Sequence, residues 1–177
     1  MILPSELYTV NIVMPKIIVD KDNNEYKEFE PASFKDLLDH VKSQGYENKL
    51  SLQLLDIEKY KNQESDPFLH KEYSVNIHKS FDVYLIAFDI GGFTIFLPEN
   101  ALVLKKVGDD TIEKVEVSTL QQEDQLLVYM FDSITCFQGI TEIRKRLKYQ
   151  IYGAIEFDLE DKYAVPVGSP HLQVYVS

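Results

Sequence analysis

From residue 73 onward, the sequence is a series of short apolar segments separated by turn residues, and no other feature constrains the fold as strongly. The segments are rich in β-branched and aromatic residues, as in FDVYLIAFDI (81–90) and LQVYV (172–176). Turn-forming residues separate them at positions 91–92, 98–100, 108–110 and 168–170. Short strands at close spacing are typical of closed or curled sheets. The sequence therefore predicts a mainly β fold, either a β-barrel-like body or a curled sheet, and not an α/β fold.

The first 72 residues combine strand and helix patterns. Residues 7–13 and 16–19 favour two strands, and the polar run 20–24 favours a hairpin turn after them. Apolar residues then recur at the spacing of one helix face, at Phe34, Leu37, Leu38 and Val41. This spacing predicts one helix near residues 34–44. Residues 50–66 fit neither period, which leaves them open between a short strand and a second helical stretch.

Chain length and composition predict a single domain over residues 1–177. A chain of 177 residues is about the size of one domain. Its hydrophobic fraction of 45% is enough to build a sizeable core, and no flexible linker separates two compositions. Within this domain, we expect residues 1–72 to contain strands and the helix, and residues 73–177 to form a β-rich body.

Charge and cysteine content exclude several classes of protein. With 29 acidic and 18 basic residues, the net charge of −11 repels nucleic-acid phosphates and anionic membranes. The N-terminal segment lacks the pattern of a signal peptide, and no apolar run is long enough to span a bilayer. The single cysteine, Cys136, excludes an intrachain disulfide. We therefore expect a cytoplasmic protein, or one assembled into a particle in the cytoplasm, that has no nucleic-acid or membrane partner.

No motif of a familiar enzyme class or cofactor site occurs in the sequence. Residues 20–25 begin like a calcium loop, but Glu25 stands at the glycine position and Pro31 at the position of the bidentate glutamate. The nucleophile elbow, the phosphate-binding loop and the dinucleotide fingerprint are absent. The histidines lack the close spacing of zinc ligands and stand at His40, His70, His78 and His171. The sequence predicts no catalytic residue, no metal, no cofactor and no enzymatic activity.

One concentrated basic patch interrupts the acidic chain. It consists of Arg144, Lys145, Arg146 and Lys148. Such a patch is a candidate partner-binding site, because it can hold a phosphate or the acidic surface of another protein. If the segment is a strand, however, its charges fall on both faces, and protection of a sheet edge explains them equally well.

Three segments of the second half share the order of features of a known fold. Residues 93–104 (FTIFLPENALVL) look like a strand, a Thr-x-x-His motif and a second strand. Residues 115–128 look like a block in which a leucine precedes a Gly-Asp pair and a strand, and residues 150–174 look like closing strands. Over residues 83–176, the chain thus resembles the Hint fold of hedgehog autoprocessing domains and inteins. The resemblance implies a Hint-like body for this half of the chain.

The residues that perform the chemistry of the Hint family are replaced in this sequence. Leu97 and Asn100 stand where the family places the Thr and His that activate the scissile peptide, and Glu123 replaces the usual glycine. The nucleophilic cysteine or serine of the N-terminal junction is absent. The final residues, 174–177, lack the family's terminal His-Asn pair. The resemblance therefore implies the fold without self-cleavage.

These observations lead to a functional hypothesis and two alternatives. The first is a non-enzymatic structural or protein-interaction subunit of a larger homo- or hetero-oligomeric assembly, such as a viral or phage particle, because the 11 Tyr and 10 Phe residues can supply contact area to other protein subunits. An acidic inhibitor that mimics nucleic acid is the second. The third is a hydrolase whose site combines distant residues, for instance His70 or His78 with Asp66 and Glu72.

Overall fold

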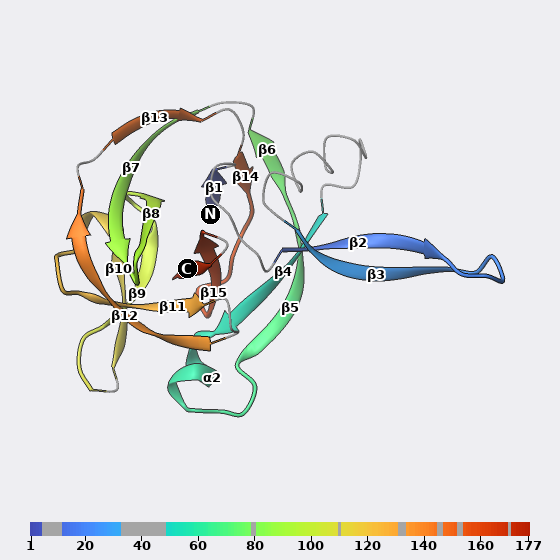
Figure 1. Cartoon of the computed structure of the whole chain (residues 1–177), viewed down its shortest axis with the longest axis horizontal. Coiled ribbons are helices and arrows are strands. Elements are labelled where there is room, and N and C mark those ends of the chain that lie inside the picture. The colour runs from blue at the N-terminus through green and yellow to red at the C-terminus, as the bar shows by residue number, and fades with distance from the viewer. Residues whose placement is uncertain are drawn as a thin grey trace.

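The computed structural model describes residues 1–4, 12–32, 49–78, 81–109, 111–130, 134–144, 147–151, 154–169 and 171–177. The helix predicted near residues 34–44 lies outside these ranges. Strands dominate the described chain (Figure 1). The prediction of a mainly β fold is therefore confirmed.

The strands of the first half and its helix have the following bounds: β1 (Ile2–Pro4), β2 (Ile12–Val19), β3 (Glu25–Ala32), β4 (Lys49–Asp56), α2 (Ile57–Lys61), β5 (Phe68–Ser74), β6 (Asn76–His78) and β7 (Phe81–Ile90). The second half continues with β8 (Phe93–Pro98), β9 (Leu102–Lys106), β10 (Ile112–Glu116), a 3₁₀ turn η1 (Val117–Thr119), β11 (Gln125–Met130), β12 (Ile134–Ile143), β13 (Leu147–Ile151), β14 (Ala154–Glu156), β15 (Tyr163–Gly168) and β16 (Leu172–Val176).

A curled antiparallel sheet forms the body of the molecule. Its thirteen described strands follow the order β13-β7-β12-β11-β9-β16-β15-β4-β2-β3, with β10 added to β9, β5 to β4 and β8 to β7. The path ends at β13 on one side and at β3 on the other, so the sheet is not closed into a barrel. A small second sheet has the order β1-β14-β6. Of the two forms predicted from the sequence, the curled sheet is the one observed.

The ambiguous segment 50–66 contains both a strand and a helix. Strand β4 runs to Asp56, and the five-residue helix α2 follows directly. Leu52 and Leu54 face one apolar cluster, whereas Leu55 belongs to another. Because β4 buries Leu55 on the face opposite to Leu52 and Leu54, its apolar residues depart from the alternation of a strand with one solvated face.

Two apolar clusters lie on opposite faces of the central strands. Neighbouring residues of β9 and β16 show this division, because Val103 and Val174 belong to the larger cluster, and Leu104 and Tyr175 to the smaller one. The smaller cluster consists of Leu55, Ile57, Leu104, Ile112, Leu127, Ala164 and Tyr175. Helix α2 contributes Ile57, which is 4% exposed. The central sheet is therefore covered on both sides.

A long hairpin of β2 and β3 projects away from the body (Figure 1). The two strands pair over eight positions, but β2 pairs with β4 only through Ile12 and Val13. The sequence predicted a break at Pro15, whereas β2 continues through it. Strand β2 has a neighbouring strand on both sides only at its first two residues. Pro15 lies beyond them, and a proline is tolerated where one side of a strand has no hydrogen-bonded neighbour.

In the described part of the chain, no helix combines the length and the apolar character that a membrane crossing requires.

Candidate functional site

Both ends of the chain are held inside the ring of strands, where Figure 1 marks N and C. The Met1 ammonium donates to the Phe157 carbonyl over 2.8 Å, and the Phe157 N–H donates to the Met1 carbonyl over 3.0 Å. Strand β1 continues this ladder along β14, with Ile2 opposite Glu156. The N-terminal residue is thus fixed by the backbone that follows β14.

The C-terminal residue is held by two hydrogen bonds. The backbone N–H of Ser177 donates to the carbonyl of Leu102 over 2.9 Å, and its hydroxyl donates to the carbonyl of Tyr163 over 2.8 Å. Val176, which precedes it, is 2% exposed. The serine hydroxyl therefore has a defined orientation at the end of a buried strand.

A single stretch of backbone, residues 157–163, contacts both ends of the chain. We call it the bridging segment. Its first residue, Phe157, pairs with Met1, and its last, Tyr163, accepts the hydrogen bond from Ser177. The Tyr163 N–H donates to the Glu160 carbonyl over 3.0 Å, which closes a turn within the segment. Any shift of this turn therefore moves the partners of both terminal residues.

Strand β5 fixes the bridging segment through charge and hydrogen bonding. The Tyr73 hydroxyl donates to Glu160 Oε2 over 2.6 Å, and the Lys71 ammonium forms an ion pair with Glu160 Oε1. Lys71 also lies 5.4 Å from the ring centroid of Tyr73 and 5.6 Å from that of Tyr163. The Tyr73 ring packs on Phe157 at 5.4 Å. These contacts hold both ends of the segment against β5.

Burial changes the acidity of the Tyr73 hydroxyl. The side chain is 7% exposed, and this burial, with a smaller contribution from Tyr163, raises the pKa of Tyr73 to about 12. A phenol in an apolar environment keeps its proton because its charged form is poorly solvated there. At neutral pH, Tyr73 therefore acts as a hydrogen-bond donor to the Glu160 carboxylate.

The two substituted positions of the Hint motif lie in β8 and in the turn that joins β8 to β9. Leu97 is fully buried in the larger cluster, and Asn100 is exposed in the turn. The next strand begins at Leu102, whose carbonyl holds Ser177. The position of a motif histidine therefore carries an amide, which cannot perform the proton transfer of an imidazole.

Glu123, which stands where the Hint family has a glycine, adopts a left-handed backbone conformation. Its φ angle is 74°, in the left-handed region. The Glu123 N–H donates to the Ile140 carbonyl over 2.8 Å, and the Ile140 N–H donates to the Asp124 backbone carbonyl over 2.8 Å. Residues with a side chain rarely adopt this conformation. In this turn, a residue with a side chain thus holds a backbone conformation that glycine adopts more readily.

The predicted partner-binding patch is only partly described. Arg144 forms an ion pair with Asp89 at 3.0 Å, and its N–H donates to the Ala87 carbonyl. Lys145 and Arg146 lie outside the described residues, and Lys148 lies in β13 at the sheet edge. The hydrogen bond from Thr94, followed by Arg144, lowers the pKa of Asp89. Binding of a partner by this patch stays a prediction.

Of the residues proposed for a hydrolase site, His70 and Glu72 are both exposed two positions apart on β5, whereas His78 lies on β6. His78 Nε2 is 2.7 Å from Glu156 Oε2, a carboxylate that the sequence did not suggest. Asp66 accepts a bond from the Phe68 N–H. His171 stacks on Phe93, and His40 lies outside the described ranges. Among the side chains that the structure places, no group of three or more His, Cys, Asp or Glu could hold a metal ion.

The residues that surround the two chain ends were not recognised in the sequence. Lys71, Tyr73 and Glu160 have no characteristic spacing, since 87 positions separate Tyr73 from Glu160. Tyr163 was visible only as part of the closing strands of the Hint resemblance, and Ser177 only as one of the final residues that lack the family's His-Asn pair. That resemblance was the one available signal.

No family model matches the sequence, and no curated protein matches it. The fold, in contrast, is similar to solved intein structures over nearly the whole chain. One is a KlbA intein precursor from Methanococcus jannaschii, with a TM-score of 0.59, 10% identity, and coverage of 96% of this chain and 90% of that chain. Another is the transcription factor IIB Mvu mini-intein, with a TM-score of 0.56, 15% identity, and coverage of 96% and 98%. A third is the TvoVMA intein, with a TM-score of 0.53, 13% identity, and coverage of 95% and 96%.

These similarities confirm the Hint-like fold and extend it from residues 83–176 to almost the full chain. They also correct the functional hypothesis. A structural or interaction subunit of a viral or phage particle is the wrong interpretation, as are its alternatives, because the solved structures that share this fold are inteins. The error arose because the abundance of tyrosine and phenylalanine was interpreted as contact surface. Part of it is core, since Tyr73, Phe88, Phe157, Tyr163 and Tyr175 are buried.

Proposed function

We propose that this chain has an autoprocessing role and acts on its own polypeptide, at the peptide bond between Val176 and Ser177. The observation that carries the proposal is the position of Ser177, whose hydroxyl is held inside an intein-like fold by the bridging segment. Inteins and hedgehog autoprocessing domains, which share this fold, act on peptide bonds of their own chains. The substrate would therefore be the chain itself.

Met1 provides no second nucleophile beside the bridging segment. Met1 carries a thioether, which cannot accept an acyl group from a peptide bond, and its backbone is held in a strand pairing with Phe157. Leu97 and Asn100 replace the residues that activate the scissile peptide in the Hint family. Because these activating residues are replaced, we propose that the chain does not splice and that its reaction is restricted to the bond before Ser177.

The proposed step is a shift of the acyl group from nitrogen to oxygen. Ser177 Oγ attacks the carbonyl carbon of Val176, the bond from this carbon to the Ser177 nitrogen breaks, and the hydroxyl proton ends on the freed amine. The product is an ester, which water or added hydroxylamine then cleaves. This step departs from the expectation of no self-cleavage, which rested on the missing Thr and His, the missing N-terminal nucleophile and the missing terminal His-Asn pair.

The structure orients the hydroxyl but gives it no strong base. The acceptor of its hydrogen bond is the Tyr163 carbonyl, which fixes the direction of the O–H bond. A hydroxyl is a weak nucleophile until a neighbouring base removes its proton. The reaction is therefore expected to be slow, and a thiol at the same position, which ionises more readily, should accelerate it.

Intact-mass spectrometry of the chain fused at both ends to inert folded proteins tests the proposal. Incubation with hydroxylamine should produce one cut, between Val176 and Ser177, while the N-terminal fusion stays intact. Ser177→Ala should abolish this cut and Ser177→Cys should accelerate it. Ser118→Ala, which removes an exposed hydroxyl elsewhere, should leave the rate unchanged. A wild-type fusion that keeps its full mass, or a cut that persists in Ser177→Ala, would overturn the proposal.

A further inference from the structure

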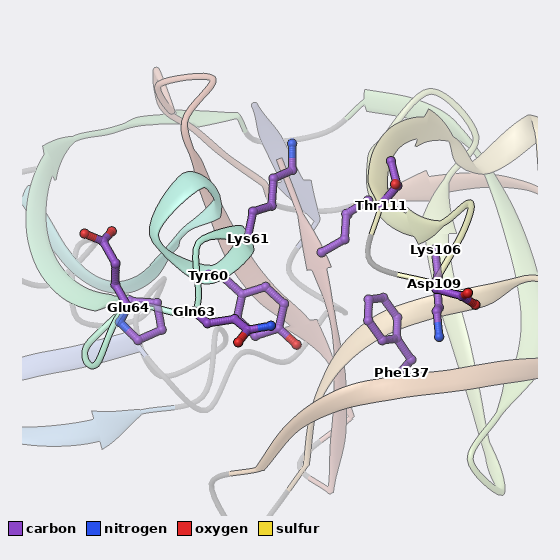
Figure 2. A pocket seen from close by; sticks show the side chains of 10 residues that line it. Tyr60, Lys61, Gln63, Glu64, Lys106, Asp109, Thr111 and Phe137 are labelled. Carbon is purple, nitrogen blue, oxygen red and sulfur yellow. The ribbon is translucent and has the colours of Figure 1, made fainter.

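A cleft of about 360 Å³ lies outside the region of the chain ends, between α2 and the loop that joins β9 to β10 (Figure 2). Its size falls within the range of small-molecule sites, which begins at roughly 300 Å³. The cleft borders the smaller apolar cluster, to which its lining residue Ile112 belongs. It is therefore separate from the site proposed for autoprocessing.

Two aromatic side chains line the cleft from different elements. Tyr60 comes from α2 and Phe137 from β12, and Figure 2 shows open space between their side chains. Both side chains are half-buried and pack on the smaller cluster, which holds them in place. Burial, with a smaller effect of Cys136, raises the pKa of Tyr60, so its hydroxyl stays protonated. A planar ring can insert between such walls, because aromatic pairs gain from stacked and edge-to-face contact.

Two lysines lie at the same cleft. Lys106 holds its ammonium 5.5 Å from the ring centroid of Phe137, and in the described part of the chain it forms no ion pair with a carboxylate. The adjacent Lys105 is paired with Asp124 at 2.8 Å. Lys61 makes only an exposed contact of 3.5 Å with Glu58. The chain has a net charge of −11, yet the half-buried Lys106 has no carboxylate partner among the described residues. Its ammonium can therefore bind the carboxylate of a ligand.

The remaining polar groups complete the recognition pattern. Glu64 and Asp109 line the cleft together with the Thr111 hydroxyl and the Gln63 amide. Carboxylates accept hydrogen bonds from amide N–H groups. The cleft thus combines a place for a ring, a cation for a carboxylate and acceptors for an amide.

We propose that this cleft binds an aromatic carboxylate that also carries an amide, as in an N-acylated aromatic amino acid or the aromatic C-terminal residue of a peptide. The ring lies between Tyr60 and Phe137, and the carboxylate lies at Lys106. The amide N–H faces Asp109, which lies on the Lys106 side of the cleft, whereas the Glu64 carboxylate points away on the other side of Tyr60 (Figure 2). Peptide carboxylates are recognised in proteins by small numbers of convergent polar groups of this kind.

Isothermal titration of the full chain with two matched probes tests this proposal. N-acetyl-tyrosine carries the carboxylate, and N-acetyl-tyrosine amide has the same ring and the same acyl group without the charge. The acid should bind at least about tenfold more tightly, a difference that charge-assisted hydrogen bonds commonly supply. Equal binding of the two probes, or no binding of the acid at millimolar concentration, would overturn the proposal.

Variants identify the residues responsible. Lys106→Met should reduce the affinity for the acid to that for the amide, whereas Lys106→Arg should keep the preference. Lys59→Met removes a lysine of α2 that does not line the cleft, and it should leave both affinities unchanged. Phe137→Leu should weaken both probes equally. An unchanged preference in Lys106→Met, with circular dichroism that shows a folded chain, would contradict the assignment.

A third probe distinguishes the two proposed kinds of ligand, a small aromatic acid and the aromatic C-terminal residue of a peptide. Tetraglycyl-tyrosine presents the same carboxylate and ring at the end of a peptide. Tighter binding than that of N-acetyl-tyrosine would identify a peptide terminus as the ligand, and equal binding would identify a small aromatic acid. If neither tetraglycyl-tyrosine nor N-acetyl-tyrosine binds, the proposal that the cleft recognises an aromatic carboxylate is refuted.

Discussion

Tyr73 connects the packing of the core to the polar contacts that hold the chain ends. Its ring packs on Phe157, and its hydroxyl bonds to Glu160. Both partners belong to the bridging segment, which contacts Met1 and Ser177. A single side chain of β5 thus influences the position of both termini.

The first prediction concerns the Tyr73 hydroxyl. Tyr73→Phe removes a hydrogen bond to a charged acceptor while it keeps the ring, so the free energy of unfolding should fall by about 2 kcal/mol in urea titration. Tyr175→Phe provides the comparison. Its hydroxyl bonds to the neutral Thr135 over 2.9 Å, and the loss should be about 1 kcal/mol. A loss for Tyr73→Phe no greater than that for Tyr175→Phe would contradict the stronger bond.

The second prediction concerns alkaline pH. Burial raises the pKa of Tyr73 from 10.0 to about 12, so the folded state favours the protonated phenol. This contribution to stability is complete below pH 10 and is lost as the pH rises through the folded value, because the unfolded chain releases the proton first. The unfolding free energy should therefore fall between pH 10 and about 12, and it should fall less in Tyr73→Phe. If the unfolding free energies of the wild type and Tyr73→Phe fall in parallel with pH, the loss of stability does not come from the Tyr73 phenol.

At the scale of elements, α2 shows how a short helix is held at a defined position. The Asp56 carboxylate accepts a hydrogen bond from the Lys59 N–H over 3.1 Å, and Ile57 is anchored in the smaller cluster. A helix of five residues has little stability of its own. Its cap and its one buried residue therefore determine where Tyr60 lies in the cleft.

The third prediction is that Asp56→Ala destabilises the protein by about 0.5–2 kcal/mol, since it removes the N-cap of α2. Chemical denaturation measures the loss. Glu58→Ala in the same turn removes only an exposed contact with Lys61 and should cost less than about 0.5 kcal/mol. Equal effects of the two substitutions would show that the cap contributes nothing.

The fourth prediction concerns the turn between β15 and β16. Gly168 has a φ angle of 156°, and a Cβ added there would lie 2.8 Å from the Leu172 carbonyl oxygen and 3.2 Å from the Gln173 Cα. Backbone cannot yield as a side chain can, so Gly168→Ala should cost about 3 kcal/mol or more in thermal and urea unfolding. Gly92→Ala also has a positive φ but meets no atom within 4 Å, and it should cost about 1 kcal/mol. A smaller loss for Gly168→Ala than for Gly92→Ala would contradict the steric argument.

At the scale of the whole molecule, strands from both halves of the sequence share one sheet. Strand β4 of the first half pairs with β15 of the second, and β16 continues the same sheet toward β9 and β11. Hydrogen-bonded strands therefore join the two predicted parts, residues 1–72 and residues 73–177, across their boundary. The single domain over residues 1–177 stays a prediction that unfolding can test.

The fifth prediction is that the chain unfolds in one cooperative transition. Far-UV circular dichroism reports the sheet, and the fluorescence of the 11 tyrosines reports packing in a chain without tryptophan. Coincident urea midpoints for the two signals are expected of one domain of this size. Two separate midpoints would indicate that the halves unfold independently.

The amino-acid sequence by itself determined the mainly β class, the acidic charge and the resemblance to the Hint fold. These properties are local, because alternation, turn residues and the order of short blocks are all visible along the chain. The replacement of motif residues at Leu97 and Asn100 was visible for the same reason.

Only the tertiary structure decided which distant residues meet. The contact of Tyr73 with Glu160 and that of Met1 with Phe157 depend on strand order and register, which no local pattern contains. The cleft between α2 and the β9–β10 loop has the same origin. Local periodicity fixes the face on which a side chain lies, but pairing across the sheet fixes its neighbours.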